Sequence, residues 1–335
     1  MRHTPHSARR AARLIGPRRS TQRGAALLLA MLIMTLVTTL AASMVWQQYR
    51  AIQVEAAERA RTQAAWILTG ALDWARLILR EDGRTGGTDH LGEPWAVPLA
   101  EARLSSFLAA DRDNNSVAEN DSLDAFLSGS IADAQSRYNL RRLIRPEDGT
   151  PNPAEVKILT RLCSAAGADG DCANRIAAAL AKAWPPTGTA TSGVAAIRPQ
   201  RLAQLTWLGI DADTIKRIEP WVDILPIATP INVNTAPAEV IAACVEDMSL
   251  GNAQRLVQER QRTVLRDLGA LPAKAYFPAN AQIKPADLDV KSSFFIVRGR
   301  LRLEERVLEE RSLVERQGME VTVRTRERVN LLDGI

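Results

Sequence analysis

The feature that most constrains this chain is an uncharged apolar stretch close to its first residue. It runs from Ala25 to Trp46, directly after Gly24, and contains no Asp, Glu, Lys or Arg. As an α-helix it would be roughly 33 Å long, which matches the hydrocarbon thickness of a bilayer. The sequence therefore predicts one membrane-spanning helix.

The basic residues are concentrated ahead of that stretch. Seven of the 43 Lys and Arg residues are arginines within residues 1–24, a segment without any acid. The rest of the chain balances its remaining 36 basic residues against 38 acidic ones, so the net charge of +5 belongs to this tail. A basic tail is typical of the cytoplasmic flank of a membrane helix. The body gives no electrostatic argument for nucleic-acid binding.

The helical pattern continues beyond the bilayer length. No proline interrupts residues 25–82, and apolar and polar positions alternate there with helical spacing. We expect a transmembrane part over 25–46 and a part beyond the membrane over 47–82 of one long helix. Two alternatives are a secretory signal cleaved near Ala42, where "TTLAAS" offers small residues, and an uncleaved membrane anchor.

β-structure is predicted on both sides of a helical region. Residues 129–143 suggest a short strand or hairpin. Near the C-terminus the apolar residues Phe295, Val297 and Leu301 share one parity, which indicates a half-buried strand. Turns at 304–306 and 317–318 would complete an antiparallel three-stranded meander. The arginines of the opposite parity, Arg298, Arg300 and Arg302, are expected on the solvent face.

An α-helical block is expected between these β regions. Helical spacing marks helices around 156–162, 176–184 and 202–208, and another around 250–257. A further helix begins near Pro237, and either Asn234 or Thr235 could cap it. The fold class is therefore α+β, with limits of 83–149 and 285–335 for the part containing the sheet and 150–284 for the inserted all-α block.

Few residues suggest a metal site or a covalent link. Cys163 and Cys172 are close enough in sequence to form a disulfide in an oxidising compartment, which leaves Cys244 unpaired. A candidate calcium loop has alternating oxygen ligands but lacks the glycine and glutamate of an EF-hand, so a solvated acidic turn is the alternative. The candidate ligands are Asp111, Asp113, Asn115 and Asp121. A second candidate is the loop of Asp169 and Asp171. We find no nucleophile–base pair, which argues against an enzyme.

The N-terminus resembles that of type IV pilin-like proteins. In that class a prepilin peptidase removes a basic leader after a glycine, and the retained helix packs in a filament. The resemblance implies cleavage between Gly24 and Ala25, with a leader over 1–24 and N-methylation at Ala25. Filament-forming pilins carry a glutamate at the fifth mature position, which is Leu29 here. A subunit without this carboxylate fits best at a filament tip, where no further subunit docks.

Motifs across the body resemble one family, protein K of the type II (general) secretion pathway, whose members are minor pseudopilins. They are "RGAALLLAMLI", "DHLGEPWA", "SIADAQSRYNLRRL", "EPWVDILP", "INVNTAPAEV" and "FFIVRGRLRLEERVLEERSLVER". The resemblance implies a pilin-like α/β headpiece with an antiparallel sheet and an inserted domain that is SAM-like or helix-hairpin-helix-like. It also implies calcium as a cofactor, without fixing its ligands, and minor pseudopilins I and J as partners.

The resemblance implies an inner-membrane protein with a cytoplasmic N-terminus and a periplasmic body, located at the pseudopilus tip. Its function there would be pseudopilus initiation and the export of folded proteins across the outer membrane. The alternative is a single-pass anchor with a periplasmic interaction domain. A remote third is a DNA-uptake component, because "INVNTA" before a helix also suggests a helix-hairpin-helix module. The acidic residues around that segment argue against phosphate binding.

Overall fold

The computed structural model describes residues 23–104, 125–185, 197–269, 273–279, 281, 283–303 and 306–329. The chain divides into two compact units, Met1–Gln63 and Ala64–Ile335. The candidate calcium ligands Asp111, Asp113, Asn115 and Asp121 lie outside the described residues, as does most of the basic leader.

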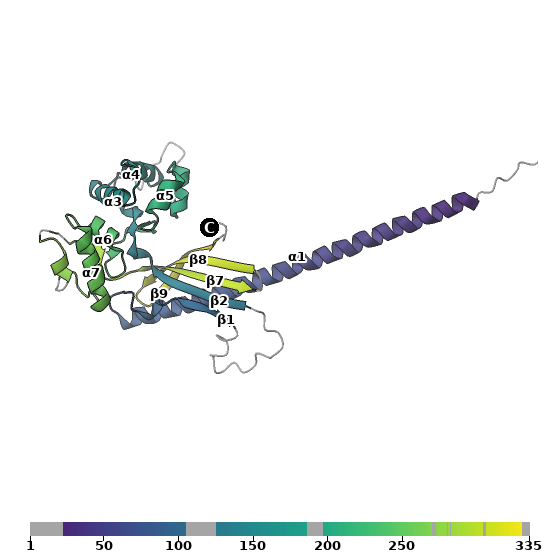
Figure 1. Ribbon diagram of the computed structural model, residues 1–335, viewed down its shortest axis with the longest axis horizontal. Helices are drawn as coiled ribbons and strands as arrows, with labels where there is room; N and C mark the ends of the chain where they lie inside the picture. Colours follow the sequence, from purple (N-terminus) through teal and green to yellow (C-terminus); the bar gives the residue numbers. More distant parts are fainter. Residues whose placement is uncertain are drawn as a thin grey trace, which may run out of the picture. The chain divides into compact units, whose positions relative to one another are not determined.

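Helix α1 spans Arg23–Thr85 (Figure 1), so the helix predicted over 25–82 is present. In the first unit its apolar side chains are exposed; those of Leu28 and Met34, for example, retain 69% and 73% of their accessible surface. Among the described residues, this is the helix long and apolar enough to cross a membrane, and its most apolar window has a mean hydropathy of 2.3. Lipid-facing side chains would explain this exposure.

The second unit contains a five-stranded antiparallel sheet in the order β1-β2-β7-β8-β9. Its strands are β1 (Leu99–Arg103), β2 (Ala125–Asp133), β7 (Phe294–Leu303), β8 (Arg306–Gln317) and β9 (Glu320–Val329). The sequence predicted the last three and part of β2, but it missed β1. That strand is a short edge strand with mostly exposed residues, so it lacks the alternation that identifies a half-buried strand.

One face of the sheet is covered by the second half of α1. Ala64, Leu68, Leu72, Ala75 and Leu79 recur at helical spacing and are all buried. The last three pack with Trp95, Phe295, Val297, Val314 and Val321 in one apolar cluster. The half-buried strand predicted from the parity of Phe295 and Val297 therefore turns these residues toward α1.

The helical block forms a second and larger core. Its helices are α3 (Pro153–Ala165), α4 (Cys172–Ala183), α5 (Ala212–Ile218), α6 (Ala238–Cys244) and α7 (Leu250–Arg262). Figure 1 shows α3, α4 and α5 in one group and α6 and α7 in another, and a single apolar cluster joins them. Leu202–Leu208 is a 3₁₀ helix, labelled η4, that ends at Gly209 in a left-handed conformation. Shorter 3₁₀ helices are η1 (Pro94–Ala96), η2 (Ala134–Ser136), η3 (Leu140–Leu143) and η5 (Ala273–Tyr276).

Two short parallel strand pairs tie this block together. β3 (Tyr138–Asn139) pairs with β4 (Val222–Asp223), and β5 (Ile231–Asn232) pairs with β6 (Leu288–Asp289). The capping prediction for α6 is wrong, because Pro237 occupies the N-cap position without a side-chain cap. Asn234 and Thr235 direct their side chains to other buried partners, described below.

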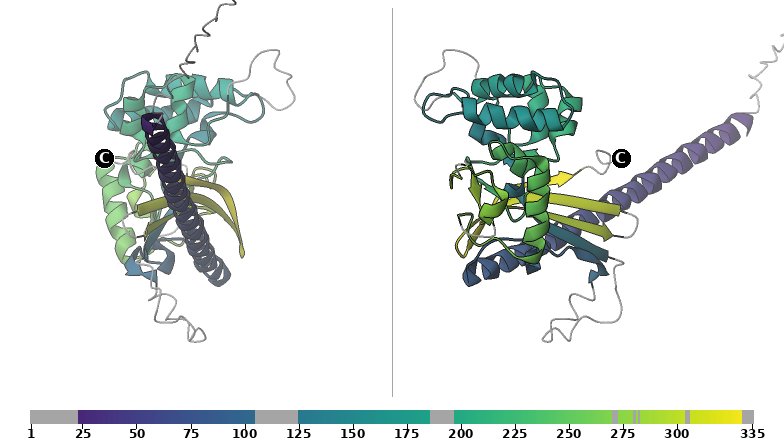
Figure 2. Two further views of the ribbon diagram at one scale, coloured as in Figure 1. Left: turned by 90° about the vertical axis from the view of Figure 1, so that its right-hand side faces the viewer. Right: turned by 60° about the vertical axis from the view of Figure 1, so that its left-hand side comes forward.

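The helical block is inserted between two strands that are neighbours in the sheet. β2 and β7 pair directly, from Ala125 opposite Leu303 to Asp133 opposite Phe295, while residues 134–293 lie between them in sequence. The block's apolar cluster extends from Tyr138 to Val290. It is therefore wider than the expected range of 150–284, since the segments that enter and leave the block also belong to its core. Figure 2 shows the block and the sheet from two further sides.

Candidate functional site

The processing residues expected from the sequence lie in the first turns of α1. Gly24, Ala25 and Leu29 are all exposed, and a Cβ atom at Gly24 would meet nothing within 4 Å. Leu29 presents an apolar side chain at 59% exposure. The cleavage itself stays a prediction.

A second exposed apolar surface lies on the part of α1 that belongs to the second unit. Trp66, Trp74 and Leu77 are 73%, 64% and 55% exposed on the side of the helix away from the sheet. Gly70 lies between the two tryptophans along the helix, and a Cβ there would meet nothing within 4 Å. We call these four residues the tryptophan stripe. Two exposed tryptophans around a glycine provide apolar area and allow another helix to approach closely.

A buried polar junction holds the helical block against the sheet. Asp133, at the end of β2, accepts hydrogen bonds on Oδ2 from Asn232 Nδ2 at 3.0 Å and from the hydroxyls of Thr235 and Ser292 at 2.6 Å each. Its Oδ1 accepts from the backbone N–H of Gln135 at 2.7 Å. One carboxylate thus connects three segments that are distant in sequence. Burial raises the pKa of Asp133 to about 6, although the bonds from Ser292, Thr235 and Gln135 act in the opposite direction.

The junction extends to α1 through an arginine. Arg316 forms ion pairs with both Asp82 and Asp89, and Asp89 Oδ2 accepts from the backbone N–H of Ser292 at 2.7 Å. Burial raises the pKa of both aspartates, which the positive charge of Arg316 partly offsets. Carboxylate oxygens of Asp82, Asp89 and Glu93 lie within 4.8 Å of one another, a spacing compatible with a shared cation. The Arg316 guanidinium already neutralises part of this cluster, so the arrangement is explained without a metal.

A third buried charge cluster lies inside the helical block. Arg142 pairs with Glu155 at 2.7 Å and with Asp287, and it donates to the carbonyl oxygen of Ala286 at 2.9 Å. The Tyr138 hydroxyl also donates to Glu155, at 2.8 Å. Burial lowers the pKa of Arg142, and the hydrogen bond and charge of Glu155 more than reverse this, so that the net change is upward. The residue is therefore a permanent buried cation.

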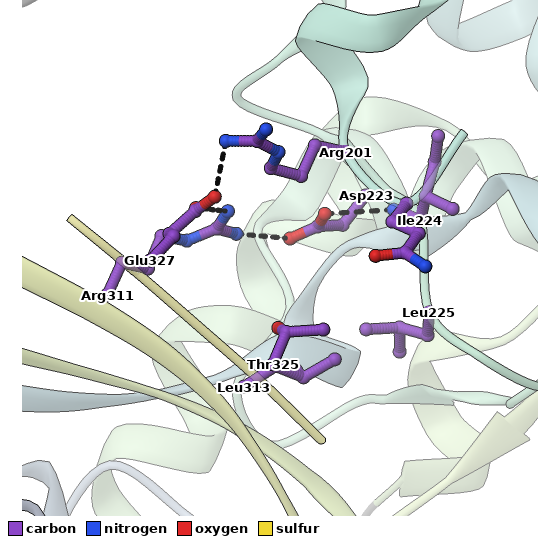
Figure 3. Close-up of a pocket in the computed structure, with 9 residues that line it drawn as sticks. Arg201, Asp223, Ile224, Leu225, Arg311, Leu313, Thr325 and Glu327 are labelled. Carbon is purple, nitrogen blue, oxygen red and sulfur yellow. Dashed lines mark hydrogen bonds and ion pairs between the residues drawn. The ribbon is translucent and has the colours of Figure 1, made fainter. Parts of the chain in front are cut away.

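Ion pairs also connect the block to the far strands of the sheet (Figure 3). Arg311 on β8 contacts Asp223 at 3.4 Å and Glu327 on β9 at 3.3 Å, and Glu327 pairs with Arg201 of the block. These side chains line a small pocket together with Leu225, Leu313 and Thr325, among others. Its charges are paired with one another across the pocket. Because these charged side chains pair with one another, we interpret the pocket as part of a structural contact between the helical block and the sheet.

Of the other predicted residues, the structure joins Cys163 and Cys172 in a disulfide and leaves Cys244 free. Asp169 and Asp171 lie in the loop that this disulfide closes. Arg175 pairs with Asp169 at 3.4 Å, which opposes cation binding there. Which loop holds calcium stays a prediction.

The chain matches proteins that share one description. A family model for the type II secretion system (T2SS) protein K matches residues 231–291, which include the Asn232 and Thr235 side of the polar junction. The chain is 30% identical to the type II secretion system protein K of Pectobacterium carotovorum subsp. carotovorum over 91% of its length and 96% of that protein. The chain belongs to the type II secretion system protein K family. The protein of that description from Pseudomonas aeruginosa is 29% identical over 73% of this chain and 74% of its own length.

A solved structure shows the same fold. It is the crystal structure of the GspK-GspI-GspJ complex from the type 2 secretion system of enterotoxigenic Escherichia coli. One chain of it matches with a TM-score of 0.61 at 19% identity, over 82% of this chain and 98% of that chain. The predicted family and the α+β fold, with its long apolar helix, antiparallel sheet and helices, are confirmed. The protein is a minor pseudopilin of type II secretion.

Sequence reasoning missed the polar junction and the Arg142 cluster. The pattern of residues 129–143 predicts only a strand position for Asp133, and the sequence before α6 predicts Asn234 or Thr235 as the cap of that helix. Asn234 instead donates to the carbonyl oxygen of Leu265 at 2.9 Å, and Thr235 donates to Asp133. The available signal was the density of short polar residues in "INVNTA" beside apolar ones, because such residues are buried only when they are hydrogen-bonded.

Proposed function

We propose that this protein caps the pseudopilus of a type II secretion system, where it supports pseudopilus initiation and the export of folded proteins across the outer membrane. The observation that carries the proposal is the insertion of the helical block, residues 134–293, between two adjacent sheet strands. A subunit with such a block on its headpiece would collide with its neighbours inside a tightly packed helical filament. At the end of the filament the block is accommodated.

The N-terminal helix supports the same position. A buried carboxylate in a lipid-like environment is costly unless it is paired. Leu29 avoids this cost, and the protein therefore does not need the contact that the pilin glutamate makes with a neighbouring subunit. The family and the exposed apolar half of α1 further support an inner-membrane anchor, with the N-terminus in the cytoplasm and the body in the periplasm.

The partners we propose are minor pseudopilins I and J, which are assembled with protein K in the E. coli complex of the same fold. The tryptophan stripe is the surface on α1 for this contact, since exposed tryptophans are over-represented among the residues that dominate binding. The test is co-purification of I and J with the full-length chain and with the variant W66A/W74A. Loss of at least ten-fold in recovered partner is expected for W66A/W74A. The variant W207A removes another tryptophan, 61% exposed on the helical block, and should recover both partners. Equal recovery in all three would contradict the stripe as the contact.

We also propose that the N-terminus is processed. A prepilin peptidase cleaves between Gly24 and Ala25 on the cytoplasmic side, and the new amino group of Ala25 is methylated. This removes the basic leader and leaves the apolar helix at the mature N-terminus.

Calcium in the periplasmic part is proposed to bind the loop of Asp111, Asp113, Asn115 and Asp121. The test is thermal unfolding of the full chain with calcium and with a chelator. D111N/D113N should lose the calcium-dependent rise in Tm, while D169N/D171N should keep it. The reverse pattern would move the site to the disulfide loop.

A further inference from the structure

The face of the sheet opposite α1 carries exposed arginines on its central strand. Gly299 lies on the covered face, because a Cβ there would come within 3.2 Å of Leu68 Cδ2. Successive residues of a strand point to opposite faces, so Arg298 and Arg300 extend from the other face, and both are exposed. The small residues Ser130 and Ser128 lie directly opposite them on β2. We call these four residues the arginine face.

These two arginines differ from most others in the sheet. Among the described residues neither has an acidic partner, although Glu309 is opposite Arg300 in register. By contrast, six other arginines in strands β7 to β9 do form an ion pair. These pairs are Arg302 with Glu101, Arg311 with Asp223, Arg316 with Asp89, Arg324 with Glu315, and Arg326 and Arg328 with Glu310. Six arginines of strands β7 to β9 are thus neutralised, whereas Arg298, Arg300 and Arg306 have no ion pair among the described residues. Of these three, Arg298 and Arg300 lie on the central strand.

The position of Arg298 is unfavourable for the isolated protein. Arg311 is directly opposite on β8, and Arg300 follows two residues along the same face. Like charges directly opposite each other destabilise a sheet. Arg311 is held by Asp223 and Glu327, so its own charge is compensated, but nothing among the described residues compensates Arg298. An acidic partner would remove this repulsion.

The spacing of the two charges indicates the form of that partner. Residues two apart in a strand are separated by roughly 6.6–6.8 Å, and the same separation holds for alternate residues of any extended chain. The serines beside the arginines leave both guanidinium groups accessible. At the end of the row Phe126 is covered by the guanidinium of Arg302, 4.0 Å from the ring centroid.

We propose that the arginine face binds an extended segment of another protein with Asp or Glu at alternate positions. Two carboxylates spaced like the arginines form two charge-assisted pairs at once. The near-neutral charge of the body outside the leader disfavours nucleic acid as the ligand. The inference does not depend on the tip position of the protein.

The test uses the full-length chain in neutral detergent micelles and a fluorescent peptide of four Glu-Ser repeats. The variant R298E/R300E should bind at least ten-fold more weakly than the wild type. R298E replaces the like-charge pair with Arg311 by a pair of opposite charges, whereas R300E places a second carboxylate opposite Glu309, so the two changes act on the fold in opposite directions. R298S/R300S removes both positive charges without adding a carboxylate, and it should also bind more weakly than the wild type. The matched control is R262E/R266E, which makes the same charge change at two exposed arginines of the helical block and should stay within two-fold of the wild type. In the wild type, the peptide should slow hydrogen exchange in residues 125–133 and 294–303.

Three results would overturn the proposal. One is equal affinity of the wild type and R298E/R300E, which would assign the binding to other basic residues such as the leader. Another is an equal loss in R262E/R266E, which would mean that net charge decides. The third is displacement of the peptide by phosphatidylglycerol in the micelles at a lower concentration than by unlabelled peptide, which would assign the face to a lipid surface.

Discussion

Replacing Arg142 by methionine should be among the most destabilising single changes in the helical block. The side chain of Arg142 is 6% exposed, and that of Glu155, its partner at 2.7 Å, is 10% exposed. Methionine fills similar space but leaves Glu155 buried with only the Tyr138 hydroxyl as a partner. Breaking a buried pair on one side costs about 3–5 kcal/mol, because an uncompensated charge remains.

The assay is urea unfolding of the full-length chain in detergent, followed by near-ultraviolet circular dichroism. The double variant R142M/E155Q should recover most of the lost free energy of unfolding, because the buried charge of Glu155 is then also removed, and Asp287, whose side chain is 30% exposed, can be hydrated. The control R141M removes the neighbouring arginine, which lies 4.8 Å over the Trp184 ring, and should cost about 0.5–1 kcal/mol. A loss below about 1 kcal/mol in R142M, or a double variant as unstable as the single one, would refute the reasoning.

Three further predictions concern stability. The pKa of Asp133 is raised to about 6, so its stabilising contribution is full below about pH 4 and is lost as pH rises through 6. The unfolding free energy of the wild type should therefore fall by roughly 3 kcal/mol relative to that of D133N over this range. A difference between wild type and D133N that does not change with pH would contradict this. C163S/C172S should lower the unfolding free energy by about 2–3 kcal/mol for so short a loop. Thiol titration of the unreduced wild type in urea, where the buried Cys244 thiol becomes accessible, should show one free cysteine rather than three. G83A should destabilise the protein by about 1–3 kcal/mol, because its Cβ would lie only 2.3 Å from the backbone oxygen of Gly318. G70A lies in open space on the same helix, so it should be neutral or stabilise by up to about 1 kcal/mol. Equal effects of the two variants in thermal unfolding would refute the packing argument.

The parts of the fold that the sequence predicted well depend on local patterns. The long apolar stretch and the absence of proline predicted α1, and the parity of Phe295 and Val297 predicted β7 and its buried face. Both follow from the geometry of a single helix or strand, so that no knowledge of distant residues is needed.

The parts that could not be predicted depend on distant partners. Asp133 becomes a buried acceptor only because Thr235 and Ser292 meet it, 102 and 159 residues away. Arg142 can be buried only because Asp287 and Glu155 surround it. Strand β1 was missed for a different reason, since an exposed edge strand needs no alternation of apolar residues. Buried polar contacts of this kind have no periodic signature in the sequence.

The most direct test of the account is the mature N-terminus of the full-length chain, measured by intact-mass spectrometry after expression with and without a prepilin peptidase. We predict a mature chain that begins at Ala25 and carries one added methyl group, and only when the peptidase is present. A chain that begins at Met1 in both cases would show an ordinary membrane anchor, and cleavage near Ala42 would show a secreted protein. Either result would contradict the assignment of α1 as the retained helix of a pseudopilin.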